Sequence, residues 1–320
     1  MLTIGWFITS FLSEFDGKGV ILMDWNEGIE EFCLDITIRG FSKITIKNYR
    51  SKLKNIADYF TEKHIQILEL RTTDVKRLIL HYQERDYQAS TININISRLK
   101  KLFDYLVEEN LVQENPVRIR PLPEQKKIVS ILTDNEIKEL IVAARKHRYP
   151  LLAQRNVVIL MLMVDCGLRI SEVVGINNQD VLDKQIIIRN SKNNKDRAVA
   201  ISPVLKKELI KYKRIKKKKY HGEDQEAFIV SYQQRRLNKK AIWEILRGLL
   251  NQTGIRKSVH PHTFRHTYAS MQVRNGLDIF TISLNMGHSE INTTQKYLSS
   301  LRSDDFIEKS IKTSTLMNLK

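Results

Sequence analysis

The sequence predicts a mostly α-helical protein of two domains, with a small antiparallel β-sheet in the second domain. Apolar residues recur at i, i+3 and i+4 along most of the chain, as amphipathic helices require. Two β-branched runs, at 185–189 and 197–201, have the composition of paired strands. A proline-containing stretch with little apolar periodicity, residues 116–130, separates two groups of helices and indicates an extended linker. With 320 residues, the chain is long enough to form two ordinary cores.

The first domain is predicted to be a four-helix unit over residues 24–115. A helical pattern begins at Trp25, a second covers 42–63, and a third follows Thr72. The fourth is expected to begin with Ser90–Thr91 as its N-cap and to end near Asn110. Residues 1–23 precede the first helix pattern and are expected to be an extension outside the fold. That segment has no basic residue before Lys18 and no signal-peptide cleavage motif.

The second domain is predicted over residues 131–303, followed by a tail at 304–320. Thr133 and Glu136 form a capping box, and an apolar core helix follows at 151–166, ended by Gly167. The two β-branched runs enclose a polar loop, which predicts a β-hairpin with a basic tip. Further helices are expected at 203–219, 238–252, 262–274, 278–286 and 290–298, and a third strand at 228–230.

The charge balance favours a polyanionic partner. The chain has 53 Lys and Arg against 36 Asp and Glu, a net charge of +17, and 34 of those basic residues but only 18 acidic ones lie in 130–320. Nucleic acid is the first candidate and an anionic membrane surface the second. No stretch approaches the roughly 20 uninterrupted apolar residues of a membrane span. The two cysteines, Cys33 and Cys166, have neither disulfide-framework nor metal-ligand spacing, so a reducing cytoplasm is expected.

Four short motifs of the second domain carry functional information together. In chain order they read Cys166-Gly-Leu-Arg169-Ile-Ser-Glu172, the hairpin tip with Lys192, His260-Pro-His262-Thr-Phe-Arg265-His266, and Gly287-His288 with Tyr297 nine residues later. This series closely resembles the tyrosine recombinases, the phage-integrase and Xer family. The resemblance implies a helical core-binding domain followed by a mixed α/β catalytic domain. It also implies an enzyme that needs neither metal nor cofactor.

The resemblance assigns a role to each of six residues. Tyr297 is the expected nucleophile, attacking a phosphodiester to form a 3′-phosphotyrosyl link. Arg169 and Arg265 would bind the non-bridging oxygens, since guanidinium forks suit bidentate phosphate contact. The remaining three are the general acid Lys192, which protonates the 5′ leaving oxygen, and two histidines that bind the phosphate or accept the tyrosine proton, His262 and His288.

Several alternatives stay open on the sequence alone. Arg169 could merely pair with Glu172 at i+3, and Lys195 is a rival general acid on the same hairpin. His266 is expected to pack structurally, and Asn285 occupies a position that is usually apolar in the family. The basic run Lys206–Lys219 is equally consistent with a solvated helix face and with phosphate contact.

Two helices of the first domain carry polar faces suited to base and phosphate contact. The candidate DNA-binding residues are Lys43, Thr45, Lys47, Arg50, Asn93, Arg98, Lys100 and Lys101. The predicted partner is double-stranded DNA, and the resemblance implies a tetramer on two DNA sites. It also leaves room for a partner recombinase or accessory proteins. The rival functions are a nicking-closing enzyme that relaxes supercoils and a DNA-binding protein of the same fold that has lost catalysis.

Overall fold

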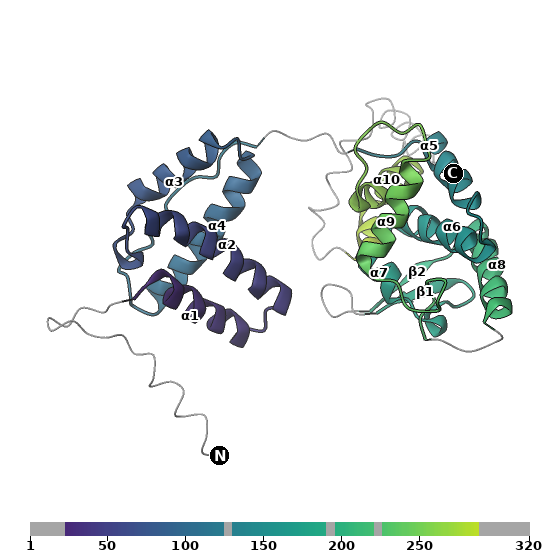
Figure 1. Ribbon diagram of the computed structural model, residues 1–320, viewed down its shortest axis with the longest axis horizontal. Helices are drawn as coiled ribbons and strands as arrows, with labels where there is room; N and C mark the ends of the chain where they lie inside the picture. The colour runs from purple at the N-terminus through teal and green to yellow at the C-terminus, as the bar shows by residue number, and fades with distance from the viewer. Residues whose placement is uncertain (1–22, 125–129, 190–195, 221–225, 288–320) are drawn as a thin grey trace, which may run out of the picture. The chain divides into compact units, whose positions relative to one another are not determined.

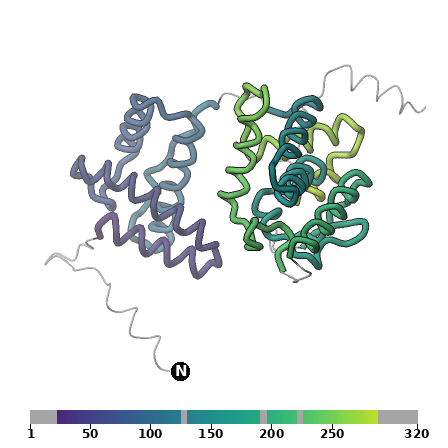
Figure 2. The backbone as a smooth tube through the Cα atoms, turned by 45° about the vertical axis from the view of Figure 1, so that its right-hand side comes forward, coloured from purple at the N-terminus to yellow at the C-terminus, as the bar shows by residue number. Residues whose placement is uncertain are grey.

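The computed structural model describes residues 23–124, 130–189, 196–220 and 226–287. They belong to two compact units, one within residues 1–127 and the other within 128–320, and each unit has its own hydrophobic core (Figure 1). The backbone trace shows the same division (Figure 2). No helix within these described ranges is long and apolar enough to cross a membrane.

The described part of the first unit has four α-helices and one short 3-10 turn, η1 (Ile67–Glu69). The helices are α1 (Trp25–Ile38), α2 (Lys43–Glu62), α3 (Thr72–Glu84) and α4 (Ala89–Glu108). Asp24 caps α1 through a reciprocal capping box with Glu27, and the Ser42 hydroxyl accepts from the backbone of α2. The predicted N-cap of the fourth helix is wrong. The N-cap of α4 is Gln88, two positions before Ser90, and its extended backbone starts the helix without a side-chain cap.

Aromatic rings fill the centre of the first core. Trp25 stacks on Phe60 at 5.1 Å between ring centroids and meets Phe103 edge-on at 6.2 Å. Met23 packs against the same core. Part of the stretch expected to be a linker also belongs here, because Val117 is buried in this core and the Pro116 carbonyl accepts a hydrogen bond from Thr72. The sequence lacks helical periodicity there because the chain packs in extended form.

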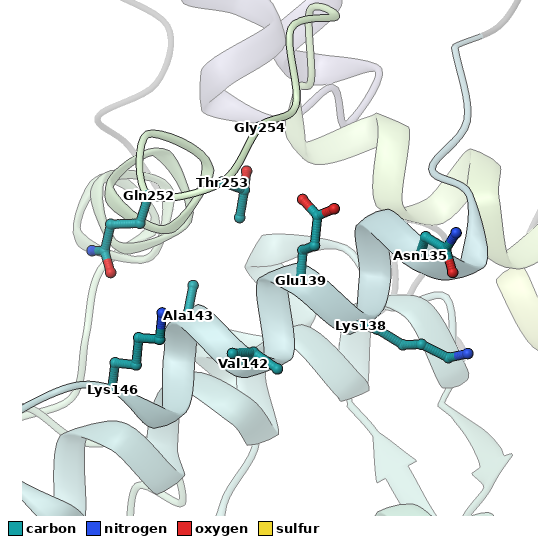
Figure 3. Close-up of a pocket in the computed structure, with 9 residues that line it drawn as sticks. All are labelled: Asn135, Lys138, Glu139, Val142, Ala143, Lys146, Gln252, Thr253 and Gly254. Carbon is teal, nitrogen blue, oxygen red and sulfur yellow. The ribbon is translucent and has the colours of Figure 1, made fainter.

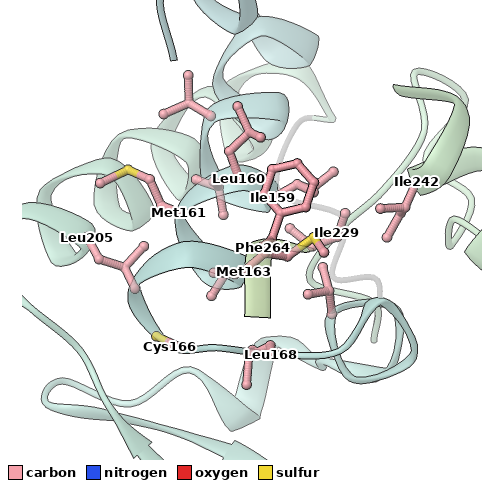
Figure 4. Close-up of a cluster of buried hydrophobic side chains, with 14 of the residues drawn as sticks. Ile159, Leu160, Met161, Met163, Cys166, Leu168, Leu205, Ile229, Ile242 and Phe264 are labelled. Atoms are coloured by element: carbon pink, nitrogen blue, oxygen red, sulfur yellow. The ribbon is translucent and has the colours of Figure 1, made fainter. Parts of the chain in front are cut away.

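The second unit is built around α6 (Pro150–Asp165), whose residues from Val157 to Met163 are all buried (Figure 4). A helix that is apolar all round must be covered on every side, and its neighbours do so. The neighbours of α6 are α5 (Asp134–Arg145), α7 (Ile170–Gly175), α8 (Pro203–Lys219), α9 (Lys239–Leu250) and α10 (Pro261–Arg274), whereas α11 (Ile279–Met286) packs on α10. Of these, α8 and α10 pack on different sides of α6 (Figure 1).

The small sheet is the predicted hairpin. Strand β1 (Gln185–Ile188) pairs antiparallel with β2 (Arg197–Ala200), and Ile188 lies opposite Arg197. A 3-10 turn, η2 (Asn178–Asp180), precedes the sheet. The mostly helical fold class with its small antiparallel sheet is confirmed.

The predicted third strand at 228–230 is wrong. Ala227, just before this run, and Val230, its last residue, make only isolated bridges, to Asn177 and Arg236 respectively. The buried ammonium of Lys216 donates to the carbonyls of Ala227, at 2.7 Å, and of Phe228, at 3.2 Å. A side chain therefore satisfies backbone groups that a neighbouring strand would otherwise pair. The apolar composition of residues 228–230 correctly predicted that the run is buried, but not its backbone structure.

Candidate active site

Arg169 follows the sharp turn that ends α6. Gly167 has a left-handed backbone, with φ of +63°, and directs the chain from α6 into α7, whose N-cap is Arg169. The Arg169 Nη1 donates to Glu172 Oε1 at 2.8 Å, and its backbone N–H donates to Oε2 at 2.8 Å. The i+3 pairing with Glu172 therefore exists. It engages only one side of the guanidinium, because Nε and Nη2 have no hydrogen-bond partner within the described ranges.

Arg265 meets Arg169 from the other side of the fold. It lies on α10, is 3% exposed, and its Nη1 donates to the Gly167 carbonyl at 2.8 Å. Its Nη2 donates to the Met286 carbonyl at the end of α11, and Arg169 Nη1 approaches the same oxygen at 3.4 Å. Two cations separated by 96 positions in the sequence thus share one carbonyl oxygen. The two arginines thus converge on one point, as expected for residues that bind one phosphate.

His262 stands one turn before Arg265 at the beginning of α10. Partial burial lowers the pKa of His262 below its ordinary value of 6.5, and the positive charges of Arg265 and Arg169 lower it further. Its imidazole is therefore neutral at neutral pH in the free protein. His266, one turn further, has its ring 6.3 Å from that of His262, measured between centroids. It is half-buried, as expected for a packing residue.

Glu172 joins this site to the hairpin. Its carboxylate is buried and also accepts from Arg197, the first residue of β2, with Nη1 at 3.0 Å from Oε1 and Nη2 at 2.9 Å from Oε2. Burial alone would raise the pKa of Glu172, but the hydrogen bonds and charges of Arg197 and Arg169 hold it below its usual value. The sequence motifs did not single out Arg197. An arginine opening a half-buried strand, beside the loop that holds Lys192, is the signal that could have found it.

The structure also explains why a polar residue, Asn285, occupies its position. Its side-chain amide lies 3.4 Å from the hydroxyl of buried Tyr268, while its backbone carbonyl accepts from Arg197 Nε at 2.9 Å. The amide raised a question about packing at a position that is usually apolar. Here the amide has a polar neighbour, the Tyr268 hydroxyl, to which an apolar side chain could not hydrogen-bond.

Three of the six predicted catalytic residues lie outside the described residues: Lys192, His288 and Tyr297. So do the rival Lys195, the helix expected at 290–298, residues 1–22 and the tail 304–320. The described chain ends next to one of these residues. Gly287, with φ of +62°, is the left-handed C-cap of α11 and directly precedes His288 in the sequence.

The predicted DNA-binding residues of the first unit differ in their availability. The charged members Lys43, Lys47, Lys100 and Lys101 are exposed, and Thr45 hydrogen-bonds with the cap Ser42. Arg50 forms an ion pair with Glu30, and Arg98 donates to Asn95. Asn93 is occupied structurally. Its amide donates to the Leu122 carbonyl at 2.9 Å and accepts from the Leu122 N–H at 2.8 Å, which holds the extended segment against α4.

One groove of the second unit lies away from the arginines. It has a volume of about 610 Å³ and lies between α5 and residues 252–254, and its lining includes Lys138, Glu139 and Lys146 (Figure 3). None of its lining residues belongs to the arginine site. Within the described ranges, no group of three or more His, Cys, Asp or Glu side chains is placed to hold a metal ion.

Comparison with known proteins identifies the family. Residues 130–303 match the phage integrase family, and residues 29–110 match the SAM-like N-terminal domain of phage integrases. The chain belongs to the phage integrase family. Tyrosine recombinase XerD of Oceanobacillus iheyensis is 30% identical over 84% of this integrase-family chain and 92% of its own length. Tyrosine recombinase XerC of Bacillus pumilus is 28% identical over 81% of this chain and 87% of its own.

Solved structures share the fold of this integrase-family protein. The Tn1549 transposon integrase in complex with transposon right end DNA matches with a TM-score of 0.70 at 16% identity, over 90% of this chain and 99% of that one. A lambda integrase dimer bound to a COC′ core site matches with a TM-score of 0.68 at 18% identity, over 86% and 77% of the two chains. The predicted resemblance to tyrosine recombinases is confirmed.

Proposed function

We propose that this member of the phage integrase family is a site-specific DNA recombinase that cuts and rejoins duplex DNA through a 3′-phosphotyrosyl intermediate. The observation that carries the proposal is the meeting of Arg169 and Arg265 at the Met286 carbonyl, with His262 beside them. Relatives aligned over most of both chains are tyrosine recombinases, which supports the same activity here.

The two arginines bind the scissile phosphate. Attack on phosphorus concentrates negative charge on the non-bridging oxygens, and preorganised cations stabilise that charge most effectively when they are partly buried. The Nε and Nη2 edge of Arg169 has no partner within the described ranges, so it can form two parallel hydrogen bonds to phosphate while Nη1 stays on Glu172. Arg265, held by the Gly167 carbonyl, supplies the second cation.

Tyr297 supplies the nucleophile. Its phenolic oxygen forms a bond to phosphorus as the bond from phosphorus to the 5′ oxygen breaks, and the phenolic proton passes to His262 or to solvent. The lowered pKa of His262 keeps this imidazole neutral and therefore able to accept a proton. His288 donates a hydrogen bond to the phosphate. The 5′ oxygen leaves as a hydroxyl after taking a proton from Lys192, and the reverse steps rejoin the strand.

Cationic side chains are proposed to replace the metal ion that many phosphoryl-transfer enzymes need. Two arginines and a lysine supply positive charge, and two histidines supply hydrogen bonds, where the transition state develops negative charge. A chelator should therefore leave cleavage of a nicked suicide substrate unchanged. Strict dependence of cleavage on Mg²⁺ would contradict this part of the proposal.

Duplex DNA is the proposed substrate and structural partner. The exposed cations of the first unit, Lys43, Lys47, Lys100 and Lys101, are proposed to contact phosphates, together with Thr45, Arg50 and Arg98. Two DNA sites would be held by four protomers, in a cytoplasmic setting. A two-site recombination assay run beside a supercoil-relaxation assay separates this function from that of a nicking-closing enzyme.

The decisive experiment removes one oxygen atom. Tyr297→Phe keeps the aromatic ring, so DNA binding should persist while covalent protein–DNA adducts disappear. Tyr220→Phe is the matched control, because the Tyr220 hydroxyl donates to the carbonyls of Ser231 and Tyr232 and takes no part in the proposed chemistry. Adducts at normal yield in the Tyr297 variant would refute the assignment of the nucleophile.

The general acid is tested by changing the leaving group. A substrate with sulfur at the 5′ bridging position releases a thiolate, which leaves without protonation. Lys192→Ala should therefore be severely impaired on normal DNA and restored on the sulfur substrate. Lys195→Ala is the control, and rescue of that variant alone would assign the acid to the other hairpin lysine.

A further inference from the structure

Arg197 occupies an unusual place among the charged residues of the second unit. It opens β2 at the base of the hairpin that contains Lys192, and its side chain is only 11% exposed. Burying a guanidinium is costly unless its N–H groups are paired with good geometry. Arg197 meets that condition, because its Nε and both terminal nitrogens have acceptors within 3.0 Å.

The first acceptor is shared with the phosphate clamp. Glu172 receives both terminal nitrogens of Arg197 and, on Oε1, also the Nη1 of Arg169 at 2.8 Å. One carboxylate therefore pairs with two guanidinium groups. Because Arg197 binds both carboxylate oxygens of Glu172, the Arg169 side chain pairs with this carboxylate through Nη1 alone. The Nε and Nη2 edge of Arg169 has no partner within the described ranges.

The second acceptor of Arg197 is the carbonyl next to the one that Arg169 and Arg265 share. Arg197 Nε donates to the Asn285 carbonyl at 2.9 Å, and the next carbonyl, of Met286, receives Arg265 and Arg169. Three arginines thus hold two successive carbonyls at the end of α11. The fit is tight, because a Cβ on Gly287 would lie 3.0 Å from Arg197 Nη1.

We propose that Arg197 is a positioning residue of the recombination site, which orients Arg169 through Glu172 and fixes the end of α11 through Asn285. This proposal rests on the proposed function of Arg169 and Arg265 as the phosphate clamp. Without Arg197, Glu172 would keep a full negative charge, and Arg169 would be the one cation left in contact with it among the described residues. The carboxylate would then draw more of the Arg169 guanidinium to itself and compete with the phosphate for it.

The first expectation is a loss of cleavage rate with little loss of DNA binding. In Arg197→Ala, single-turnover cleavage should fall roughly a hundredfold, as expected for misplacement of a reacting group by about 1 Å. Binding of an uncleaved site should change less than about threefold, since one buried side chain contributes little to sequence-independent phosphate contact. Arg197→Lys should retain only part of the rate, because an ammonium cannot span both carboxylate oxygens and a carbonyl.

Arg189 offers a matched control at the same hairpin. It follows β1 and forms an ion pair with Asp180, whose side chain is 1% exposed, at 2.6 Å. Arg189→Ala therefore also removes an arginine from a buried carboxylate, but that carboxylate has no contact with Arg169 or Arg265. Its cleavage rate should stay within a few-fold of the parent protein, with unfolding followed by calorimetry for every variant.

A neutral phosphate distinguishes positioning of the clamp from a merely structural role. Replacing one non-bridging oxygen of the scissile phosphate by methyl removes the charge that the clamp binds. The losses caused by Arg169→Ala and by Arg197→Ala should both shrink at least tenfold on this methylphosphonate. The same shrinkage is expected for Arg197→Lys, which serves if the alanine variant does not fold.

The possible outcomes separate the two proposals. If Arg169→Ala is rescued by the neutral substrate and neither Arg197 variant is, the clamp stands and the positioning role of Arg197 is refuted. If Arg169→Ala is not rescued, the clamp itself is wrong and the role of Arg197 falls with it. A loss in Arg189→Ala as large as that in Arg197→Ala would also overturn the inference, because any weakening of the hairpin would then explain the effect.

Discussion

Replacing Gly167 by alanine should destabilise the second unit and disturb the arginine site at once. Gly167 has a left-handed φ of +63°, and a Cβ built there would lie 2.4 Å from Cδ1 of Tyr268, a ring that is 4% exposed. The carbonyl of the same residue accepts from Arg265 Nη1 at 2.8 Å. The substitution therefore strains the backbone, displaces a buried ring and moves an acceptor of the proposed phosphate clamp.

The expected loss of stability follows from the left-handed backbone of Gly167 and from the contact of the added Cβ with Tyr268. A non-glycine residue in the left-handed region costs about 1–2 kcal/mol. Inserting a methyl group into a filled core costs about 1–3 kcal/mol more, because a buried ring cannot move aside freely. The free energy of unfolding should fall by about 2–5 kcal/mol. For a unit of this size, that corresponds to a decrease in Tm of roughly 4–20 °C.

Calorimetry of the full chain measures this decrease, and a second glycine supplies the control. Gly248 lies within α9 with nothing near its would-be Cβ, so Gly248→Ala should be neutral or stabilising by up to about 1 kcal/mol. A double-mutant cycle with Tyr268→Leu should return the part of the loss that is due to the ring. An unchanged unfolding transition in Gly167→Ala would refute the reasoning, because neither the backbone strain nor the clash with Tyr268 would then exist.

Three further predictions concern protonation, surface charge and assembly. In the free protein, the His262 imidazole should titrate below pH 6.5 by NMR, and Arg169→Ala should raise its pKa. Because folding lowers this pKa, its contribution to stability is present above pH 6.5 and is lost as the pH falls through the folded value. A pKa unmoved by Arg169→Ala would contradict the close approach of the two side chains. Four exposed cations of α8 face away from α6: Lys207, Lys211, Arg214 and Lys218. Neutralising them should leave the salt dependence of single-site DNA binding unchanged, whereas four real phosphate contacts would reduce its log–log slope by about 3–4. Deleting residues 304–320, which lie outside the described residues, should spare single-site binding and abolish two-site synapsis in a gel-shift assay. Synapsis at the full-length rate would show that the tail has no role between protomers.

The sequence by itself determined most of the local structure. The capping box of Thr133 and Glu136, the apolar run of α6 and the αL-tolerant hairpin loop each act through neighbouring residues, so their elements could be predicted. Where a local signal was contradicted, a distant group was responsible. Lys216 took the carbonyls expected to pair a third strand.

Only the tertiary structure decided how the candidate site is assembled. The motifs indicated that Arg169 and Arg265 belong together, but not that they meet at the carbonyl of Met286. Nor did they indicate that Glu172, suspected only of a surface pair, is a buried bridge to Arg197. A sequence displays residue types and short-range periodicity, whereas a shared carboxylate or carbonyl depends on where separate elements meet. Those meeting points are set by packing around α6 and by the need of each buried charge for a partner.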